Sequence, residues 1–311
     1  MEIITINFLI FFILSYFILK LSLPKFKEWL LEYPNFRSLH KVPTPSGGGI
    51  VFVLIGTLGA YYFKFLLPLI CLPLSFIGLI DDRINLSNKL RYFFQVITVI
   101  FLINTSALKI ETNNYFLDLI LNLILIIFLT AIINFVNFMD GIDGLVAGSM
   151  IIYLFIFANI LTPALIPLIA SLSAFLIFNW HPAKVFMGDT GSTYLGLLFA
   201  GLLLEMPSWK ISLEILLVAS PLLADAFFCI FRRILSSENI FKPHRKHLYQ
   251  RLIGNRGLTH SKVSIIYIFA SLSLAISKYF GGINLVILSL AIILFIGYYL
   301  DKKIATPFQE S

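Results

Sequence analysis

Residues 116–145 read FLDLILNLILIIFLTAIINFVNFMDGIDGL, and this stretch decides the fold class. Its first part is an apolar run of about 20 residues, the length that an α-helix needs to cross roughly 30 Å of hydrocarbon. Irregular backbone does not cross lipid, because its polar groups would have no hydrogen-bond partners. The run ends in two asparagines and two aspartates, each three residues from the next. The stretch therefore predicts a membrane-spanning helix that carries polar side chains to the bilayer surface.

Apolar runs of this kind recur along the whole chain. Of its 311 residues, 59% are hydrophobic and 13% are charged, and such a composition cannot cover a water-soluble domain. We expect an all-α integral membrane protein, with residues 1–311 forming a single polytopic bundle of about eleven transmembrane helices. The predicted spans are 3–23, 47–63, 65–80, 91–107, 116–133, 144–160, 163–179, 190–206, 211–234, 262–279 and 282–300.

Eleven crossings place the segments between the spans on two sides of the membrane in turn. One side receives 24–46, 81–90, 134–143, 180–189, 235–261 and the tail after 300. Of the 23 Lys and Arg residues, those that do not lie on or next to these segments are Lys20, Lys64, Lys109, Lys210 and Lys278. Short basic loops stay in the cytoplasm, so this side is predicted to face the cytoplasm. Nucleic acid is not an expected partner, because there is no soluble basic domain to hold it.

The same alternation brings five polar clusters to the predicted cytoplasmic face. They are HKVPTPSGGG (40–49), GLIDDRINLSNKLR (78–91), NFVNFMDGIDGL (134–145), FNWHPAKVFMGDTGS (178–192) and FKPHRKHLYQRL (241–252). An error of one in the number of helices would place the later clusters across the bilayer from the earlier ones. Their agreement therefore supports both the number of spans and a shared active site at that face.

Five carboxylates in these clusters lie at helix ends: Asp81, Asp82, Asp140, Asp143 and Asp189. Acidic side chains near lipid are costly, which implies a role for them. Five gathered carboxylates would repel one another, and a divalent cation removes that repulsion. Ligands that offer only oxygen favour Mg²⁺, or Mn²⁺ in its place, over zinc. Phosphate charge would be bound by a set of basic residues: Lys41, Lys89, Arg91, His244, Arg245 and His247.

The spacing in 134–145 adds a geometric prediction. On a helix Asn134, Asn137 and Asp140 project from neighbouring positions on one side. The glycines that follow loosen the backbone, so Asp143 turns toward a different part of the same pocket. The two cysteines, Cys71 and Cys229, fall inside predicted spans and have no spacing that signals a redox or metal role.

Each cluster alone also has a structural interpretation. Asp and Asn at helix ends serve as caps, the glycine-rich GDTGS can simply start a helix, and a basic loop can contact anionic lipid headgroups. A secondary transporter also gathers carboxylates, but it would place them near the membrane midplane in paired repeats. The sequence has no such internal symmetry, and a non-catalytic scaffold needs no concentrated acidic and basic surface. The occurrence of all five clusters on one face favours an enzyme.

Together the clusters resemble the polyprenyl-phosphate N-acetylhexosamine-1-phosphate transferases. The motifs TPSGG, DDR at a helix end, NxxNxxDGxDGL, NxxPAxVFMGDxGS and a final loop with histidine occur here in the family's order, over about 37–252. The resemblance implies a Mg²⁺-dependent enzyme that transfers a sugar-1-phosphate from a UDP-sugar to undecaprenyl phosphate. Its products would be undecaprenyl-diphosphate-sugar and UMP. Members similar to WecA are expected to have eleven helices.

The resemblance also assigns roles to individual residues. It implies that Asn137 and Asp189 hold Mg²⁺, and that Asp81, Asp82, Asp140 and His247 are catalytic, the role of Asp140 being the least settled. Uridine would be contacted by Asp143, Asn179 and Phe186, and the diphosphate by Lys41 and Lys89. The remaining substrate-binding positions are Ser46, Asn134, His244 and Arg245.

The last loop departs from one branch of the family. MraY-like members carry three consecutive histidines there, whereas this chain reads PHRKHLYQRL at 243–252. The difference favours the branch that initiates O-antigen and other cell-surface polysaccharides, and leaves peptidoglycan lipid I synthesis as the alternative. The sequence leaves open the sugar, a homodimer, and a two-step route through an aspartyl-phosphate on Asp81.

Overall fold

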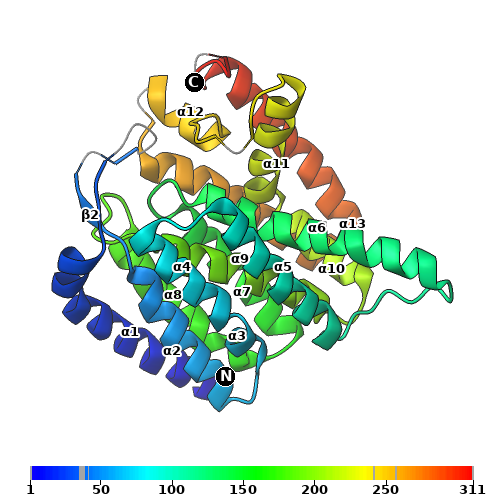
Figure 1. Ribbon diagram of the computed structural model, residues 1–311, viewed down its shortest axis with the longest axis horizontal. Helices are drawn as coiled ribbons and strands as arrows, with labels where there is room; N and C mark the ends of the chain where they lie inside the picture. The colour runs from blue at the N-terminus through cyan, green and yellow to red at the C-terminus, as the bar shows by residue number, and fades with distance from the viewer. Residues whose placement is uncertain (1, 35–38, 41, 241, 256–257, 310–311) are drawn as a thin grey trace.

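A computed structural model describes residues 2–34, 39–40, 42–240, 242–255 and 258–309 of the protein (Figure 1). These residues form a helical bundle with one very short two-stranded sheet. The helices are α1 Glu2–Trp29, α2 Gly48–Tyr62, α3 Leu67–Ile70, α4 Leu72–Ile84, α5 Asn88–Thr105, α6 Tyr115–Met139, α7 Leu145–Ile160, η1 Pro163–Leu165, α8 Ile166–Asn179, α9 Gly188–Leu204, α10 Trp209–Val218, α11 Ser220–Leu235, α12 Leu248–Asn255 and α13 His260–Lys303. The strands are β1 Leu31–Glu32 and β2 Thr44–Pro45, which pair antiparallel.

The helices follow the predicted apolar runs. Spans predicted at 47–63, 144–160 and 190–206 coincide within two residues with α2, α7 and α9. The run predicted at 211–234 is broken, because α10 and α11 meet at a 77° bend. The run predicted at 65–80 is also broken, into α3 and α4. In both cases a proline lies in the first turn of the second helix, a position that starts a helix well because the missing N–H would have no partner there.

The last two predicted spans, 262–279 and 282–300, both lie within α13. The backbone of Gly282 between them is not helical, with φ 57° and ψ −150°. The hydroxyls of Ser277 and Ser289 are 2.7 Å apart, although twelve residues of straight helix would separate them by about 18 Å. The chain therefore folds back at Gly282, and α13 consists of two helical segments.

Three helices in the described part of the chain are long and apolar enough to cross a membrane. They are Ile4–Trp29, Tyr115–Met139 and His260–Lys303, and the bent pair of α10 and α11 would make a fourth. These helices, together with several shorter apolar ones, make this a helical membrane protein. The number of eleven spans and the side that faces the cytoplasm stay predictions.

Helix α9 lies at the centre of the bundle, and every residue from Thr190 to Leu204 is buried. It packs against α4, α6 and α2, and Figure 1 shows it near the middle of the bundle. The approach of α4 is close, because a Cβ on Gly78 would lie 2.5 Å from the carbonyl oxygen of Asp189. The start of α9 is therefore held against the end of α4.

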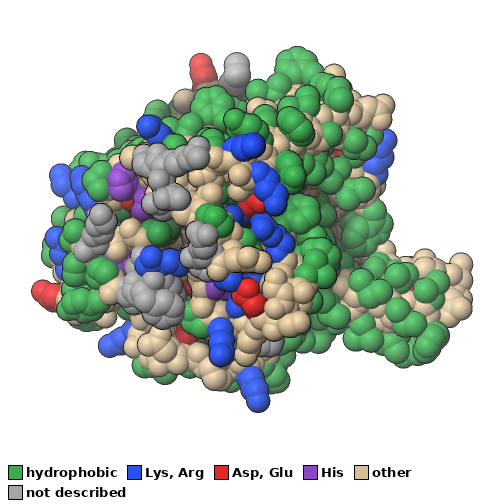
Figure 2. All heavy atoms as spheres, turned by 90° about the horizontal axis from the view of Figure 1, so that it is seen from above, with side chains coloured by type: hydrophobic (Ala, Val, Ile, Leu, Met, Phe, Trp, Pro, Cys, Tyr) green, Lys and Arg blue, Asp and Glu red, His purple; other side chains and the backbone are tan. Residues whose placement is uncertain are grey.

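The polar clusters of the sequence meet at one end of this bundle. Ser46 pairs with Phe186 in a parallel bridge, and the Tyr249 hydroxyl donates to the carbonyl of Phe138 at 2.9 Å. Figure 2 looks down on the face that carries α12 and the C-terminus, and most of the Lys, Arg, Asp, Glu and His side chains visible in it lie over the left and centre of the view. The extension at the right of that view is mostly hydrophobic. The expected convergence of the clusters is thus present in the structure.

Candidate active site

Asp82 fixes the start of α9. Its carboxylate accepts the backbone N–H of Asp189 at 2.8 Å and that of Thr190 at 3.2 Å. The Thr190 hydroxyl donates to the same carboxylate at 2.8 Å. An acidic side chain at a helix N-terminus binds unpaired N–H groups and interacts favourably with the helix dipole. Asp82 therefore joins the end of α4 to α9 and sets the direction of the Asp189 side chain.

Gly188 makes this junction sterically possible. Its φ of +67° lies in the left-handed region that glycine tolerates. A Cβ at this position would lie 2.5 Å from both the Asp82 carboxylate and the Ser46 hydroxyl. Gly188, the first glycine of GDTGS, is thus needed for the close approach of three segments: the residue after β2, the end of α4 and the start of α9.

Two carboxylates and one guanidinium form the centre of the site. Nη1 of Arg91 lies 2.5 Å from Asp81 Oδ2 and 2.7 Å from Asp189 Oδ2. Asp81 is nearly buried, and its other oxygen accepts the backbone N–H of Leu86 at 2.6 Å. The Arg91 side chain is 32% exposed. A single cation from the first turn of α5 therefore neutralises carboxylates from α4 and α9.

The asparagines of α6 approach the same centre. Nδ2 of Asn137 donates to Asp189 Oδ1 and to Ser192 Oγ, each at 2.8 Å. Asn134 exchanges hydrogen bonds with Gln95 of α5, at 2.8 and 3.3 Å. These side chains, with Asp81 and Arg91, line a small cavity of about 10 Å³, close to the smallest space that holds one water molecule.

This arrangement is compatible with a magnesium ion. Two carboxylates that face one point, from Asp81 and Asp189, are hard oxygen ligands of the kind that Mg²⁺ prefers. The guanidinium of Arg91 already occupies that point as a positive charge, so the ligand set is one that attracts a cation. Asn137 could add an oxygen only if its amide turned over, because Nδ2 is the atom that faces Asp189.

Comparison with known sequences agrees with this geometry. The sequence model of glycosyl transferase family 4 matches residues 64–206, a range that includes Asp81, Arg91, Asn137 and Asp189. A Bacillus subtilis (strain 168) protein named "Probable undecaprenyl-phosphate N-acetylglucosaminyl 1-phosphate transferase" is 31% identical over 267 residues, which cover 77% of this chain and 73% of the relative. The chain belongs to glycosyl transferase family 4.

Two further relatives are similar to this family 4 transferase over comparable lengths. A Mycobacterium leprae decaprenyl-phosphate N-acetylglucosaminephosphotransferase is 30% identical, with 76% of this chain and 73% of the relative covered. An undecaprenyl-phosphate alpha-N-acetylglucosaminyl 1-phosphate transferase from Escherichia coli (strain K12) is 29% identical, with 80% and 76% covered. These relatives therefore confirm the family resemblance that the motifs indicated.

In the family 4 transferase Asp140 and Asp143 have different environments. Asp140 caps the C-terminus of α6, where its N–H contacts the carbonyl of Asn137 at 3.2 Å. Asp143 lies in the next turn, is nearly buried, and contacts His181 Nδ1 at 2.6 Å and His260 Nδ1 at 3.3 Å. Burial alone would raise the pKa of Asp143, but the contacts with the two histidines bring that pKa below its ordinary value. Asp143 is therefore ionised at neutral pH.

Three residues of the predicted uridine and substrate contacts organise the turns around Asp143. The buried Asn179 accepts the N–H of Gly144 at 2.9 Å and donates to the carbonyl of Val185 at 3.0 Å. The Phe186 ring lies 5.0 Å from that of His40, and Ser46 is buried beside Gly188. These residues hold the 140–144 and 180–187 turns in fixed positions.

His247 lies beside the end of α6, and His244 lies next to it. His247 is buried, with its ring 6.2 Å from that of Phe138 at the end of α6. Burial, with the nearby Arg233, lowers the pKa of His247 to about 3. Burial and His247 lower the pKa of His244 to about 3 as well. Both imidazoles are therefore neutral at pH 7 in this structure, and their contact with a phosphate stays a prediction.

The remaining predicted contacts are less defined. Lys41 lies outside the described residues. Lys89 is exposed in the first turn of α5, two residues before Arg91. Arg245 is half-buried in the last loop. Their roles toward the diphosphate stay predictions.

Several residues of the site were not singled out from the sequence. Gln95 holds Asn134, Ser192 holds Asn137, and His181 and His260 hold Asp143. All four pair with residues at least 38 positions away in the chain. Spacing within one motif cannot reveal such partners. Arg91 was expected to bind phosphate, and its contacts with two carboxylates add a second role.

Proposed function

We propose that this protein transfers a sugar-1-phosphate from a UDP-sugar to undecaprenyl phosphate, releasing UMP. The observation that carries the proposal is the meeting of Asp81, Arg91, Asn137 and Asp189, from four helices, at one end of an apolar bundle. A water-borne donor and a lipid-borne acceptor can both reach such a place. The names of the relatives supply the class of acceptor, a polyprenyl phosphate, and an N-acetylhexosamine as the sugar.

The reaction exchanges one phosphorus–oxygen bond for another. An oxygen of the lipid phosphate attacks the phosphorus that carries the sugar. The bond from that phosphorus to the bridging oxygen of the diphosphate breaks, and its electron pair leaves with UMP. Little covalent chemistry is required of the protein, so positioning and charge neutralisation supply most of the catalysis.

The residues of the chain divide this work. Arg91 is the cation nearest the two carboxylates, and its 32% exposure leaves part of the guanidinium available to phosphate oxygens. Asp81 faces the cavity with one oxygen and is held from behind by the N–H of Leu86. In this position Asp81 orients the lipid phosphate or accepts its proton. Asp82 is occupied by the start of α9, so its contribution is to hold Asp189 in place.

Magnesium, held by Asp189 with Asn137 in support, would supply polarisation of the diphosphate oxygens and neutralise developing charge. The ionised Asp143, Asn179 and Phe186 form the end of the site where the uridine would bind. Phe186 offers an aromatic face, and Asp143 accepts hydrogen bonds from a base that donates them.

The cellular setting follows from the membrane fold and the chemistry. We place the enzyme in the bacterial inner membrane with this face toward the cytoplasm, where nucleotide sugars are found. The product would initiate an O-antigen or another cell-surface polysaccharide. The proposed sugar is an N-acetylhexosamine or a deoxy derivative of one.

A reconstituted assay tests the proposal. Purified protein is incubated with labelled UDP-GlcNAc, undecaprenyl phosphate and Mg²⁺, and both UMP and lipid-linked label are measured. We expect both products, loss of both with EDTA, and recovery with Mg²⁺. A panel of UDP-sugars then identifies the donor. A protein that forms neither product with any UDP-sugar of the panel is not this transferase.

Substitutions locate the activity. Asp189→Asn and Asp81→Asn should each reduce UMP release by at least about a hundredfold, as removal of one key charge-stabilising group does. Asp118→Asn is the matched control, because Asp118 lies at the opposite end of α6 and its carboxylate contacts Thr112. Full activity in both site variants would exclude the proposed centre.

A further inference from the structure

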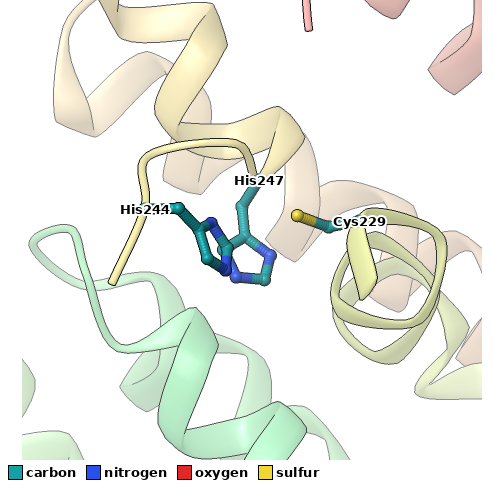
Figure 3. Close-up of side chains that lie close together, drawn as sticks. All are labelled: Cys229, His244 and His247. Atoms are coloured by element: carbon teal, nitrogen blue, oxygen red, sulfur yellow. The ribbon is translucent and has the colours of Figure 1, made fainter. Parts of the chain in front are cut away.

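A second cluster of chemically active side chains shares no residue with the carboxylate centre. Cys229 projects from α11 toward His244 and His247, which come from the loop before α12 (Figure 3). One candidate ligand atom from each of the three lies within 4.8 Å of the others. The two imidazole rings are 5.0 Å apart. Fifteen or more residues separate the cysteine from the histidines, so no sequence motif signals the cluster.

The protonation states of the histidines suit metal binding. A metal ion binds neutral imidazole, so a histidine that is already deprotonated needs to release no proton. Burial lowers the pKa of both His244 and His247 to about 3. Both rings are therefore ready as ligands at neutral pH, and only the thiol of Cys229 would have to lose a proton.

His247 also has a ring nitrogen without a partner. The residue is 3% exposed, and its Nδ1 makes no hydrogen bond within the described part of the chain. The nearest carboxylate oxygen, Asp225 Oδ1, is 3.9 Å away, too far for a hydrogen bond. A buried polar atom without a partner costs free energy. A cation bound by Nδ1 would remove that cost for His247.

Charged groups of both signs surround the cluster. Asp225 lies on the Nδ1 side of His247, and its carboxylate accepts the N–H groups of Leu248 and Tyr249 at 2.7 and 3.0 Å. The Asp225 carboxylate, with a thiolate at Cys229, would offset the nearby Arg233 and Arg251. The half-buried His244 gives an ion access from water.

We propose that Cys229, His244 and His247 form a binding site for Zn²⁺ or a metal ion of similar softness, separate from the magnesium site. One sulfur and two imidazole nitrogens are ligands that zinc prefers and magnesium does not. Three protein ligands leave a fourth position for water, which is the open form of a zinc site. A bound ion would tie the last loop to α11. It would also occupy His247, and so slow any reaction in which that residue takes part.

The proposal departs from the sequence analysis, which found no metal signal at Cys229. The sequence places Cys229 inside an apolar helix, where a thiol is usually a small hydrophobic side chain. Only the folded chain brings the loop histidines to it. Cys71 has a similar sequence setting and is also buried as a free thiol, but it belongs to no such cluster of described residues.

Cobalt spectroscopy tests the site without reference to activity. The full chain is purified in detergent with an affinity tag free of histidine, stripped of metal with EDTA, and titrated with Co²⁺. A thiolate ligand gives an intense near-ultraviolet charge-transfer band, and tetrahedral coordination gives strong visible bands. We expect both with one Co²⁺ per chain, and their loss when Zn²⁺ is added. Failure of the wild-type protein to show the near-ultraviolet band overturns the proposal.

Two cysteine variants make the assignment specific. Cys229→Ser should lose the near-ultraviolet band, whereas Cys71→Ser should keep it. The band kept in Cys229→Ser, or lost equally in both variants, would overturn the assignment to Cys229. His244→Gln is a milder change at a half-buried position, so the fold should survive it, and it should weaken Zn²⁺ binding at least about tenfold. Unchanged Zn²⁺ affinity in that variant also rejects the site.

The design separates this cluster from the one formed by Asp143, His181 and His260, whose candidate ligand atoms also lie within 4.8 Å of one another. That group contains no sulfur. Co²⁺ bound there would give visible bands without the thiolate band, an outcome that counts against the proposal. The result is independent of whether the protein transfers sugar phosphate, because no substrate is present.

Discussion

Arg91 and a divalent cation compete for the same two carboxylates, and this competition can be measured. In Arg91→Gln the charge that lies 2.5 Å from Asp81 and 2.7 Å from Asp189 is removed. Loss of one partner from a buried ion pair costs about 3–5 kcal/mol. Arg91 is 32% exposed, so we expect the lower end, about 3 kcal/mol. At roughly 2 °C for each kcal/mol, Tm without metal should fall by about 6 °C.

Magnesium should reverse most of this loss. Without Arg91 the carboxylates of Asp81 and Asp189 have no counter-charge from that side chain, so Mg²⁺ should bind more tightly than in the wild type. At a concentration one hundred times its Kd, a ligand of the folded state adds about 2.7 kcal/mol. Tm measured in EDTA and in saturating Mg²⁺ should therefore differ more for the variant than for the wild type.

The control for this experiment is Arg83→Gln. Arg83 is exposed in the last turn of α4, and its substitution removes the same charge without touching the two carboxylates. It should change neither Tm nor the effect of Mg²⁺. The reasoning is refuted if Arg91→Gln is no less stable than Arg83→Gln in EDTA. It is also refuted if Mg²⁺ raises Tm by the same amount in the Arg91 variant and the wild type.

Other substitutions test the frame of the site. Asp82→Ala removes the cap of α9 and should lower the free energy of unfolding by about 2 kcal/mol, measured by denaturation; no change would exclude the capping role. Gly188→Ala should cost about 1–3 kcal/mol, because φ is +67° there, whereas Gly297→Ala, at a position where a Cβ meets nothing within 4 Å, should not. The pKa of His247 is about 3 in the fold against an ordinary 6.5, so the unfolded chain binds the extra proton and stability should fall as pH drops from about 6.5 toward 3. His247→Gln should flatten that pH dependence of Tm, and an unchanged slope would contradict the lowered pKa.

Helix positions were predictable because lipid imposes a simple rule on the sequence. A run of apolar side chains long enough to cross hydrocarbon forms a helix, so the run at 116–133 became the first part of α6. This rule does not predict where a helix breaks inside an apolar run. The bend between α10 and α11 and the break between α3 and α4 lie inside continuous apolar runs. Pro221 and Pro73 mark the starts of α11 and α4, and they were the available signals.

The site was predictable to the extent that its residues sit in local motifs. The family resemblance predicted that Asn137 and Asp189 lie together, and Nδ2 of Asn137 donates to Oδ1 of Asp189 at 2.8 Å. Arg91 was seen only as a basic residue for phosphate, because its contact with Asp189 spans 98 positions of the chain. The pKa values of His244 and His247 also depend on burial, which sequence spacing does not contain. Local pattern finds the residues, and packing decides which atoms meet.

The helix ends explain why this centre requires a cation. Asp81 lies near the C-terminus of α4 and Asn137 near that of α6, where unpaired carbonyls give each helix a partial negative charge. The N-terminus of α9 supplies partial positive charge, but Asp82 already binds its first N–H groups. The point between Asp81 and Asp189 is therefore strongly negative without Arg91. An anionic phosphate can approach it only after positive charge has been placed there, and the carboxylates bind that charge in advance of the substrate.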